Sequence, residues 1–256
     1  MATRVSDGGP AVVRQRQAQR ALTRLVARDM RGLRRIIIPS RLGATVPDWI
    51  AAVRALVDQY GAASSALAAD YYEAERIAAR VTGRFTVPLA APPPQERVES
   101  SLRWAAKDLW PRDPDDPATT PAQRQPMDVR LTQAEKKAEA VAQKLVADQG
   151  RDTVREAVRQ DRQATAWARS AALGACSFCK MLAIRGAVFK QDTADFRAHD
   201  NCHCGVVPVF RGQRFELSDH AREWERLYRE FAAPHSGDQL RRFRRALAEH
   251  GHLPAL

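Results

Sequence analysis

The stretch PDWIAAVRALVDQYGAASSALAADYYEAERIAARVTG, residues 47–83, carries the longest helical pattern in the chain and decides the fold. Its apolar and small residues alternate in steps of four and three, the repeat of a helix that packs along its whole length against others. Pro47 suits a first-turn position, and Gly83 suits a position just past a helix C-terminus. The pattern predicts a helical hairpin or bundle. The seam positions are Val53, Val57, Tyr60, Ser64, Leu67, Tyr71, Ala74, Ala78 and Val81.

Helical spacing continues on both sides of this stretch. Residues 12–30 predict a basic amphipathic helix, and residues 98–109 predict a third helix that stops before Pro111. Five prolines fall between residues 111 and 126, and because proline disrupts both helices and central strands, we predict a linker over residues 111–128.

Beyond the linker the helical pattern resumes over residues 131–145. After Gly150 it returns with Val154, Ala157 and Val158 and continues through Ala164 and Ala168. Two helices separated at Gly150 are therefore predicted.

The periodicity breaks between residues 174 and 214, where the runs 187–189 and 206–210 favour short strands. Ser218 is placed to cap a following helix. Ser236 and Gln239 have the spacing of a capping box before a last helix.

These patterns predict a mainly α fold. A helical N-terminal region over residues 1–110 is followed by the Pro-rich linker and by a C-terminal α+β module over residues 129–256. A Cys/His knuckle at residues 174–212 lies inside that module.

The chain is strongly basic, with 41 Lys and Arg against 30 Asp and Glu in 256 residues and a formal net charge of +11. Such a balance favours polyanionic partners, nucleic acid before acidic protein, although a merely solubilising charge gives the same excess. No apolar run approaches the roughly 20 residues of a membrane-spanning helix, so we expect no membrane contact. We predict sequence-independent binding of double-stranded DNA through two arginine-bearing helices. The residues are Arg14, Arg16, Arg20, Arg24, Arg241, Arg242, Arg244 and Arg245.

All four cysteines fall between residues 176 and 204, in a C-x2-C pair and an H-x2-C-x-C group. Two thiolates two residues apart can hold one tetrahedral zinc ion together with a distant second pair. We favour Cys176, Cys179 and Cys202 with His199 as the fourth ligand, and Cys204 is the main rival for that place. Because Cys202 and Cys204 are so close in sequence, both can bind only if the backbone turns sharply.

Four other interpretations of the cluster stay open. The cysteines could be redox-active, or they could be buried as small apolar residues without a metal. Cys176 or Cys202 with His199, Asp200 and Asn201 also supplies the residue types of a cysteine nucleophile or a zinc-supported nuclease. A closed four-ligand zinc site has no open position for water, so we expect a structural site and no enzymatic role.

The segments GACSFCKMLAIRGAVF, residues 174–189, and FRAHDNCHCGVVPVF, residues 196–210, together with Trp167, resemble a known family. They are similar to the C-terminal module of phage head-morphogenesis proteins related to protein F of phage Mu, above all the actinobacteriophage versions. Leu182 and Gly186 stand where that pattern places a leucine and a glycine. The resemblance covers about residues 165–215.

The resemblance implies a minor capsid protein that associates with the portal or the major capsid protein and assists head assembly, DNA packaging or DNA delivery. It implies a place in the virion, in the head interior or near the portal, with host cytoplasm as the site of assembly and with several copies in each particle. Some relatives are described as capsid maturation proteases, which is the alternative. His220 and the other C-terminal histidines are expected to be solvated.

Overall fold

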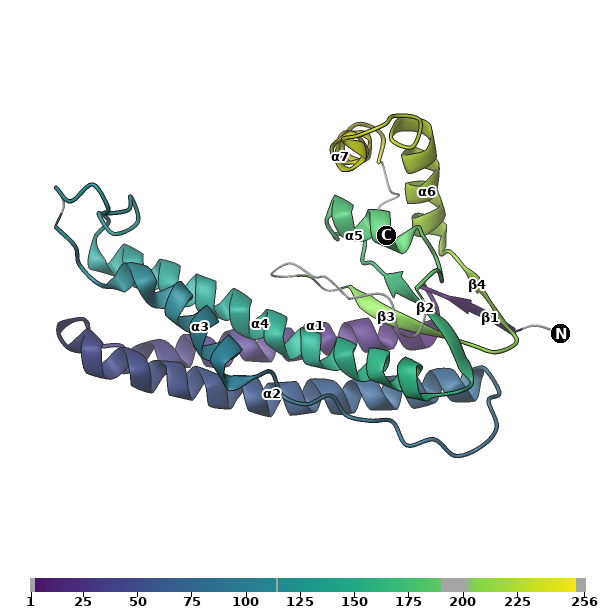
Figure 1. Cartoon of the computed structure of the whole chain (residues 1–256), viewed down its shortest axis with the longest axis horizontal. Helices are drawn as coiled ribbons and strands as arrows, with labels where there is room; N and C mark the ends of the chain where they lie inside the picture. The colour runs from purple at the N-terminus through teal and green to yellow at the C-terminus, as the bar shows by residue number, and fades with distance from the viewer. Residues whose placement is uncertain (1–2, 114, 190–201, 203, 252–256) are drawn as a thin grey trace.

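The computed structural model describes residues 3–113, 115–189, 202 and 204–251. An elongated layer of helices carries a small strand-containing part at one end, with three further helices beyond it (Figure 1). The elements are β1 (Thr3–Ser6), α1 (Pro10–Leu33), η1 (Arg34–Ile36), η2 (Pro39–Arg41), α2 (Leu42–Ala78), α3 (Gln95–Ala106), η3 (Lys107–Leu109), α4 (Met127–Gln160), β2 (Ala164–Ser170), α5 (Ser177–Ala183), β3 (Gly205–Phe210), β4 (Gln213–Glu216), α6 (Asp219–Phe231) and α7 (Gln239–His250). The predicted mainly α fold with a small C-terminal α+β part is confirmed.

Helices α1 to α4 share one apolar core, and α4 contacts α1, α2 and α3. The long helix predicted from residue 47 begins five residues earlier, at Leu42, so Pro47 lies inside it. Leu42, Val46 and Trp49 are all buried in the core. Their burial extends the helix upstream of the proline, because tertiary packing outweighs the hydrogen bond that Pro47 cannot donate.

Gly150 does not separate two helices, because α4 runs through it without interruption. A Cβ atom at Gly150 would lie 2.5 Å from Ser64 Oγ and 3.1 Å from the Ser64 carbonyl oxygen, and one at Gly61 would overlap the Gln149 side chain. The glycines therefore let α2 and α4 approach closely. The predicted break was wrong because a glycine required by packing looks in sequence like a helix terminator.

Ala164 and Ala168 lie in strand β2 and not in the predicted helix. The helix ends at Gln160, and the Asp161 carbonyl accepts a hydrogen bond from the Ala164 N–H in the turn that follows. Strand β2 then pairs antiparallel with β3, and Trp167 stacks on Phe189 with ring centroids 4.3 Å apart. Residues four positions apart lie on one face of a strand, where side chains alternate with a period of two, and also on one face of a helix. The spacing of the two alanines could therefore not distinguish strand from helix, and the helical interpretation was wrong.

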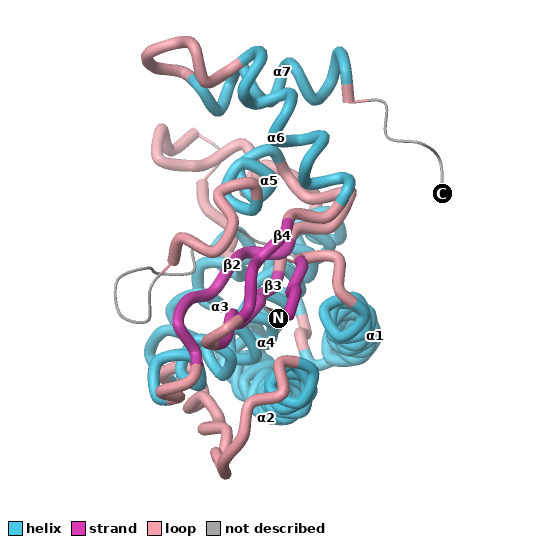
Figure 2. The backbone as a smooth tube through the Cα atoms, turned by 90° about the vertical axis from the view of Figure 1, so that its right-hand side faces the viewer, coloured by secondary structure: helices cyan, strands magenta, loops and turns pink. Residues whose placement is uncertain are grey.

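Strand β1 pairs in parallel with β4, which brings residues 3–6 beside residues 213–216. Figure 2 shows the strands between the helical layer and helices α5 to α7. Ser218 occupies the position before α6, as predicted, although its own side chain makes no capping hydrogen bond. Helix α7 begins after Asp238, whose left-handed backbone (φ 48°) replaces the expected capping box at Ser236.

No single helix in the described part of the chain is long and apolar enough to cross a membrane. By length and composition alone, residues 10–36 and 39–78 pass that test only as a pair bent by 68°.

Candidate metal centre

The cysteines are carried by two segments that meet beside the end of the helical layer. Cys176 precedes α5, and its sulfur accepts a hydrogen bond from the Cys179 N–H at 3.4 Å, which caps the helix. Cys179 is in the first turn of α5. Cys204 directly precedes β3, and Cys202 lies two residues before it. A short helix and the start of a strand thus bring together residues more than 20 positions apart.

Three of the thiols form a cluster. The sulfur atoms of Cys179, Cys202 and Cys204 all lie within 4.8 Å of one another, and those of Cys179 and Cys202 are 3.5 Å apart. All three residues are buried, whereas Cys176 is half-buried. The separations are small enough for one metal ion to bind the three sulfurs.

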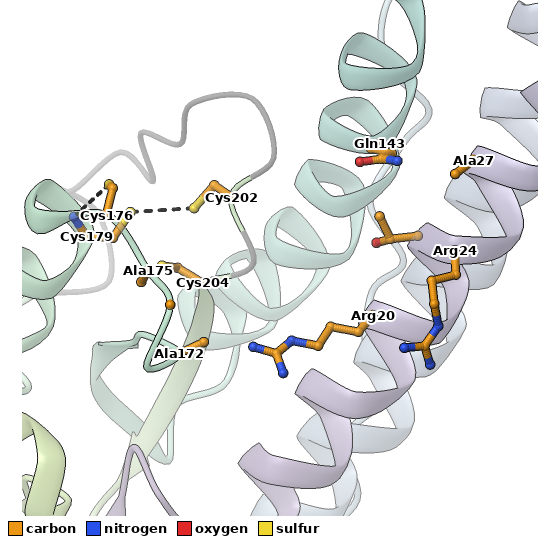
Figure 3. A pocket seen from close by; sticks show the side chains of 12 residues that line it. Arg20, Arg24, Ala27, Gln143, Ala172, Ala175, Cys176, Cys179, Cys202 and Cys204 are labelled. Atoms are coloured by element: carbon orange, nitrogen blue, oxygen red, sulfur yellow. Dashed lines mark hydrogen bonds between the residues drawn. The ribbon is translucent and has the colours of Figure 1, made fainter. Parts of the chain in front are cut away.

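The cluster differs in membership from the ligand set that the sequence favoured. The structure places Cys204, the rival candidate, together with Cys179 and Cys202, while the Cys176 sulfur is engaged with the Cys179 N–H (Figure 3). His199, with Asp200 and Asn201, lies outside the described residues. Cys202 and Cys204 therefore both lie at one site.

Two buried arginines support the cluster, and the sequence analysis missed both. Arg151 of α4 donates from Nε to the Cys204 carbonyl at 2.8 Å and from Nη2 to the Cys202 carbonyl. Arg169 of β2 is 1% exposed and donates from Nη1 to the Cys179 sulfur at 3.7 Å. Their positive charge favours thiolates over thiols, and Arg151 fixes the backbone that carries two of the sulfurs. The one sequence signal for a buried arginine beside the cysteines is an arginine between small residues, as in Ala168-Arg169-Ser170.

Shared protons make the three thiols unequal. A hydrogen bond from Cys179, with a second from Cys204 and the nearby Arg151 charge, lowers the pKa of Cys202. Donating that hydrogen bond raises the pKa of Cys179. For Cys204, a hydrogen bond with Cys179 lowers the pKa, but its bond to Cys202 and its burial raise it to about 12. A metal ion binds thiolates, so metal binding at this cluster would release the protons that the three sulfurs share.

The arginines predicted to bind DNA lie on two separate helices. On α1, Arg14, Arg20 and Arg24 are exposed and Arg16 is half-buried. Burial, followed by the charge of Arg20, lowers the pKa of Arg16. On α7, the four arginines are exposed around the buried Phe243, and Arg244 Nε donates to Ser177 Oγ at 3.3 Å. These residues are Arg241, Arg242, Arg244 and Arg245.

A cavity of about 690 Å³ separates α1 from the cysteine-bearing segments. Arg20, Thr23, Arg24 and Ala27 form its α1 wall, Gln143 of α4 contributes to the lining, and all four cysteines border it. Figure 3 shows the Arg20 side chain reaching from α1 toward the cysteine-bearing side. The clustered cysteines thus border a space that also receives arginine side chains.

The structure also brings together Asp7, Ser218 and His220, which the sequence analysis did not group. The fully buried Asp7 accepts hydrogen bonds from the Ser218 N–H at 2.7 Å and from Ser218 Oγ at 2.9 Å. His220 Nε2 lies 3.1 Å from Ser218 Oγ and 3.8 Å from Asp7 Oδ2, and burial lowers the His220 pKa. His220 is therefore half-buried in a network and not simply solvated.

The order of contacts in this network is not that of a serine hydrolase. In a hydrolase the acid holds the histidine and the histidine accepts from the serine, whereas here the carboxylate binds the serine and its backbone directly. A buried carboxylate at the start of α6 is a helix cap. A separation of 211 positions between Asp7 and Ser218 left no local pattern to detect.

Comparison with known proteins gives one result on identity. The profile of a protein family described as VG15 protein matches residues 9–231. This range includes the helical layer, the cysteine cluster and α6. No curated protein and no solved structure matches the chain.

Proposed function

The chain belongs to the VG15 protein family, and on that premise we propose that it is a minor capsid protein that acts in head morphogenesis of a tailed phage. Membership of this viral family points to a phage protein, found in the virion or in the infected host. The head interior or the portal region is the proposed place in the virion, with assembly in the host cytoplasm.

The observation that carries the proposal is the thiol cluster of Cys179, Cys202 and Cys204. These residues belong to the C-x2-C and H-x2-C-x-C groups on which the resemblance to the phage Mu protein F family rests. A motif whose cysteines converge in space is a structural unit and not a chance spacing. The convergence therefore supports the relationship and, with it, the head-morphogenesis role.

Zinc is the metal that these donors fit. Buried thiolates are soft ligands, and structural zinc sites take four ligands from cysteine and histidine. Cys179, Cys202 and Cys204 supply three, and Cys176 or His199 supplies the fourth. The buried Arg151 and Arg169 offset the negative charge of a zinc–thiolate group, and Arg151 orients two ligands through their carbonyls. Bound zinc would stabilise the junction of β3 and α5.

The proposed partners are double-stranded DNA, the portal protein and the major capsid protein. Exposed arginines on α1 and α7 suit sequence-independent contact with phosphates, which weakens with a log–log salt slope of roughly −0.9 for each phosphate neutralised. Binding of duplex DNA across a salt series tests this contact directly. Affinity that does not change with salt would assign these arginines to protein contacts.

A capsid maturation protease is the second candidate and a zinc-supported nuclease the third, although the contacts of Asp7, Ser218 and His220 are those of a helix cap and not of a catalytic triad. Ser218→Ala separates the two main candidates. A minor capsid protein keeps its function in this variant, apart from a small loss of stability at α6. A protease would lose all cleavage of capsid proteins.

Cross-linking mass spectrometry of purified virions tests the proposal as a whole. We expect peptides of this chain in mature particles, cross-linked to portal or major capsid peptides, in several copies per particle. Detection only in infected cells, with none in mature particles, would contradict the capsid role.

A further inference from the structure

The α1 wall of the cavity between α1 and the cysteine-bearing segments is positively charged. Its α1 wall carries Arg20 and Arg24, one helical turn apart, and both side chains are exposed to it. No carboxylate of the described residues lies within ion-pair distance of either guanidinium. Among the described lining residues none is Asp or Glu.

A third arginine of α1, Arg16, borders a neighbouring cavity and not this one. Arg16 lies one turn before Arg20, and its Nη1 atom is buried without a hydrogen-bond partner among the described residues. Burial and then repulsion from the Arg20 charge lower the pKa of Arg16, whereas the charges of Asp7 and Cys204 raise it. An anion beside Arg20 would relieve that repulsion and replace the solvent around both groups.

The size of the cavity restricts which anion can enter. A volume of about 690 Å³ is within the range of small-molecule sites, so the cavity admits a nucleotide and not a segment of duplex. A terminal phosphate monoester carries more charge than an internal phosphodiester and offers three oxygens to two guanidinium groups. The Gln143 side chain on α4 can accept a hydrogen bond from the nucleoside that carries the phosphate, or donate one to it.

We propose that this cavity binds a phosphate monoester through Arg20 and Arg24, either as the 5′ end of a DNA strand or as a free nucleotide. The strand-end form rests on the proposed DNA contact, and the nucleotide form does not depend on it. The site differs from the phosphate contacts along duplex DNA, because it recognises an end and not a length of backbone.

Isothermal titration of the full-length metal-loaded protein with four probes tests the site. The probes are inorganic phosphate, dAMP and a single-stranded oligonucleotide with either a 5′-phosphate or a 5′-hydroxyl. We expect the 5′-phosphate to increase affinity about tenfold or more, since charge-assisted hydrogen bonds are the stronger class. We also expect dAMP to compete with the phosphorylated strand.

The double variant Arg20→Gln/Arg24→Gln should abolish the preference for the 5′-phosphate and the binding of dAMP. Arg31→Gln/Arg35→Gln removes the same charge from the end of α1 and from η1, outside the cavity, and it should keep both. Metal content measured in each variant shows that the cysteine cluster is intact.

The outcomes separate this site from general DNA binding. Loss of duplex binding with retained dAMP binding contradicts the DNA contact alone and assigns the cavity to a free nucleotide. Equal affinity for the two oligonucleotides, with no binding of dAMP or phosphate, overturns the cavity proposal whatever happens with duplex DNA. An equal loss in both double variants also overturns it, because the effect would then be bulk charge.

Discussion

In the helical layer, Val53, Leu102 and Ala138 are fully buried in one apolar core, whereas the buried set around α5 includes three cysteine thiols. The first region is stabilised by many similar contacts spread over four helices. The stability of the second region depends on a few buried cysteine thiols, which must stay uncharged or bind a metal ion. Loss of one contact should therefore weaken the layer slightly and the cysteine region severely.

The largest expected effect comes from the cysteine region. Cys179→Ser should abolish metal binding and open residues 174–212 to protease, because binding and local folding are one event with apparent free energies of roughly 10–16 kcal/mol in small zinc sites. The helices α1 to α4 should keep their helicity. Elemental analysis, limited proteolysis and circular dichroism measure the three outcomes.

Cys176→Ser and His199→Ala sharpen this result. Both should also lose metal if they complete the ligand set, and a variant that keeps its zinc is not a ligand. Full metal content together with unchanged protease resistance in Cys179→Ser would contradict the structural metal centre.

The next effect lies where the two regions meet. Arg76 near the end of α2 forms a buried ion pair with Asp161, and Tyr72 Oη donates to the same carboxylate at 3.1 Å. Asp161→Asn would leave the Arg76 charge buried and unpaired, at a cost of about 3–5 kcal/mol in unfolding free energy. Denaturant unfolding measures it.

Asp152→Asn is the matched control for that variant. Asp152 pairs with Arg155 on the surface of α4 and its side chain is 52% exposed, so the change should cost at most about 1 kcal/mol. Equal effects in the two variants would mean that burial does not distinguish these ion pairs.

Within the helical layer, Gly150→Ala should lower the unfolding free energy by about 1–3 kcal/mol, since its Cβ would meet Ser64 of α2. Gly32→Ala on α1 has no atom within 4 Å of its Cβ and should stabilise slightly through helix propensity. Thermal unfolding of the two variants should thus shift in opposite directions. A higher melting temperature in Gly150→Ala would show that α2 and α4 do not approach as described.

The smallest expected effect depends on pH. Burial raises the pKa of Glu75 to about 7, and the Arg14 charge opposes this only in part. The folded protein then holds a proton that the unfolded chain releases near its ordinary pKa of about 4.3, so stability should fall by roughly 1–2 kcal/mol as pH rises from 5 to 7. Glu75→Gln should remove this slope. An unchanged slope in that variant would assign it to other groups.

The sequence predicted the helices better than it predicted their ends and contacts. The four-three repeat between Val53 and Tyr71 identified α2, because a helix that packs against other helices along its length has apolar residues at regular helical spacing. Gly150, Ala164 and Ala168 were misjudged because local spacing does not say whether a small residue ends an element or admits a neighbour.

The sequence predicted that the cysteines gather at one site, and the ligand set stays a prediction. Spacing identified the cysteines as a group, but it could not say that Cys204 faces Cys179 and Cys202 while Cys176 caps α5. No local sequence pattern indicates the contacts of Arg151, Arg169 and Asp7, because their partners lie elsewhere in the sequence. Such contacts depend on tertiary placement, which only the folded chain provides.

The parallel pairing of β1 with β4 also sets an order of events during synthesis. Residues 3–6 leave the ribosome well before their hydrogen-bond partners at residues 213–216, which are made more than 200 positions later. The first strand must therefore wait unpaired while the helices form, and closing so long a loop is slow. Once Ser218 has bound Asp7, the segment that follows β1 is held at the start of α6, and a nascent chain cut short before that point cannot make this contact.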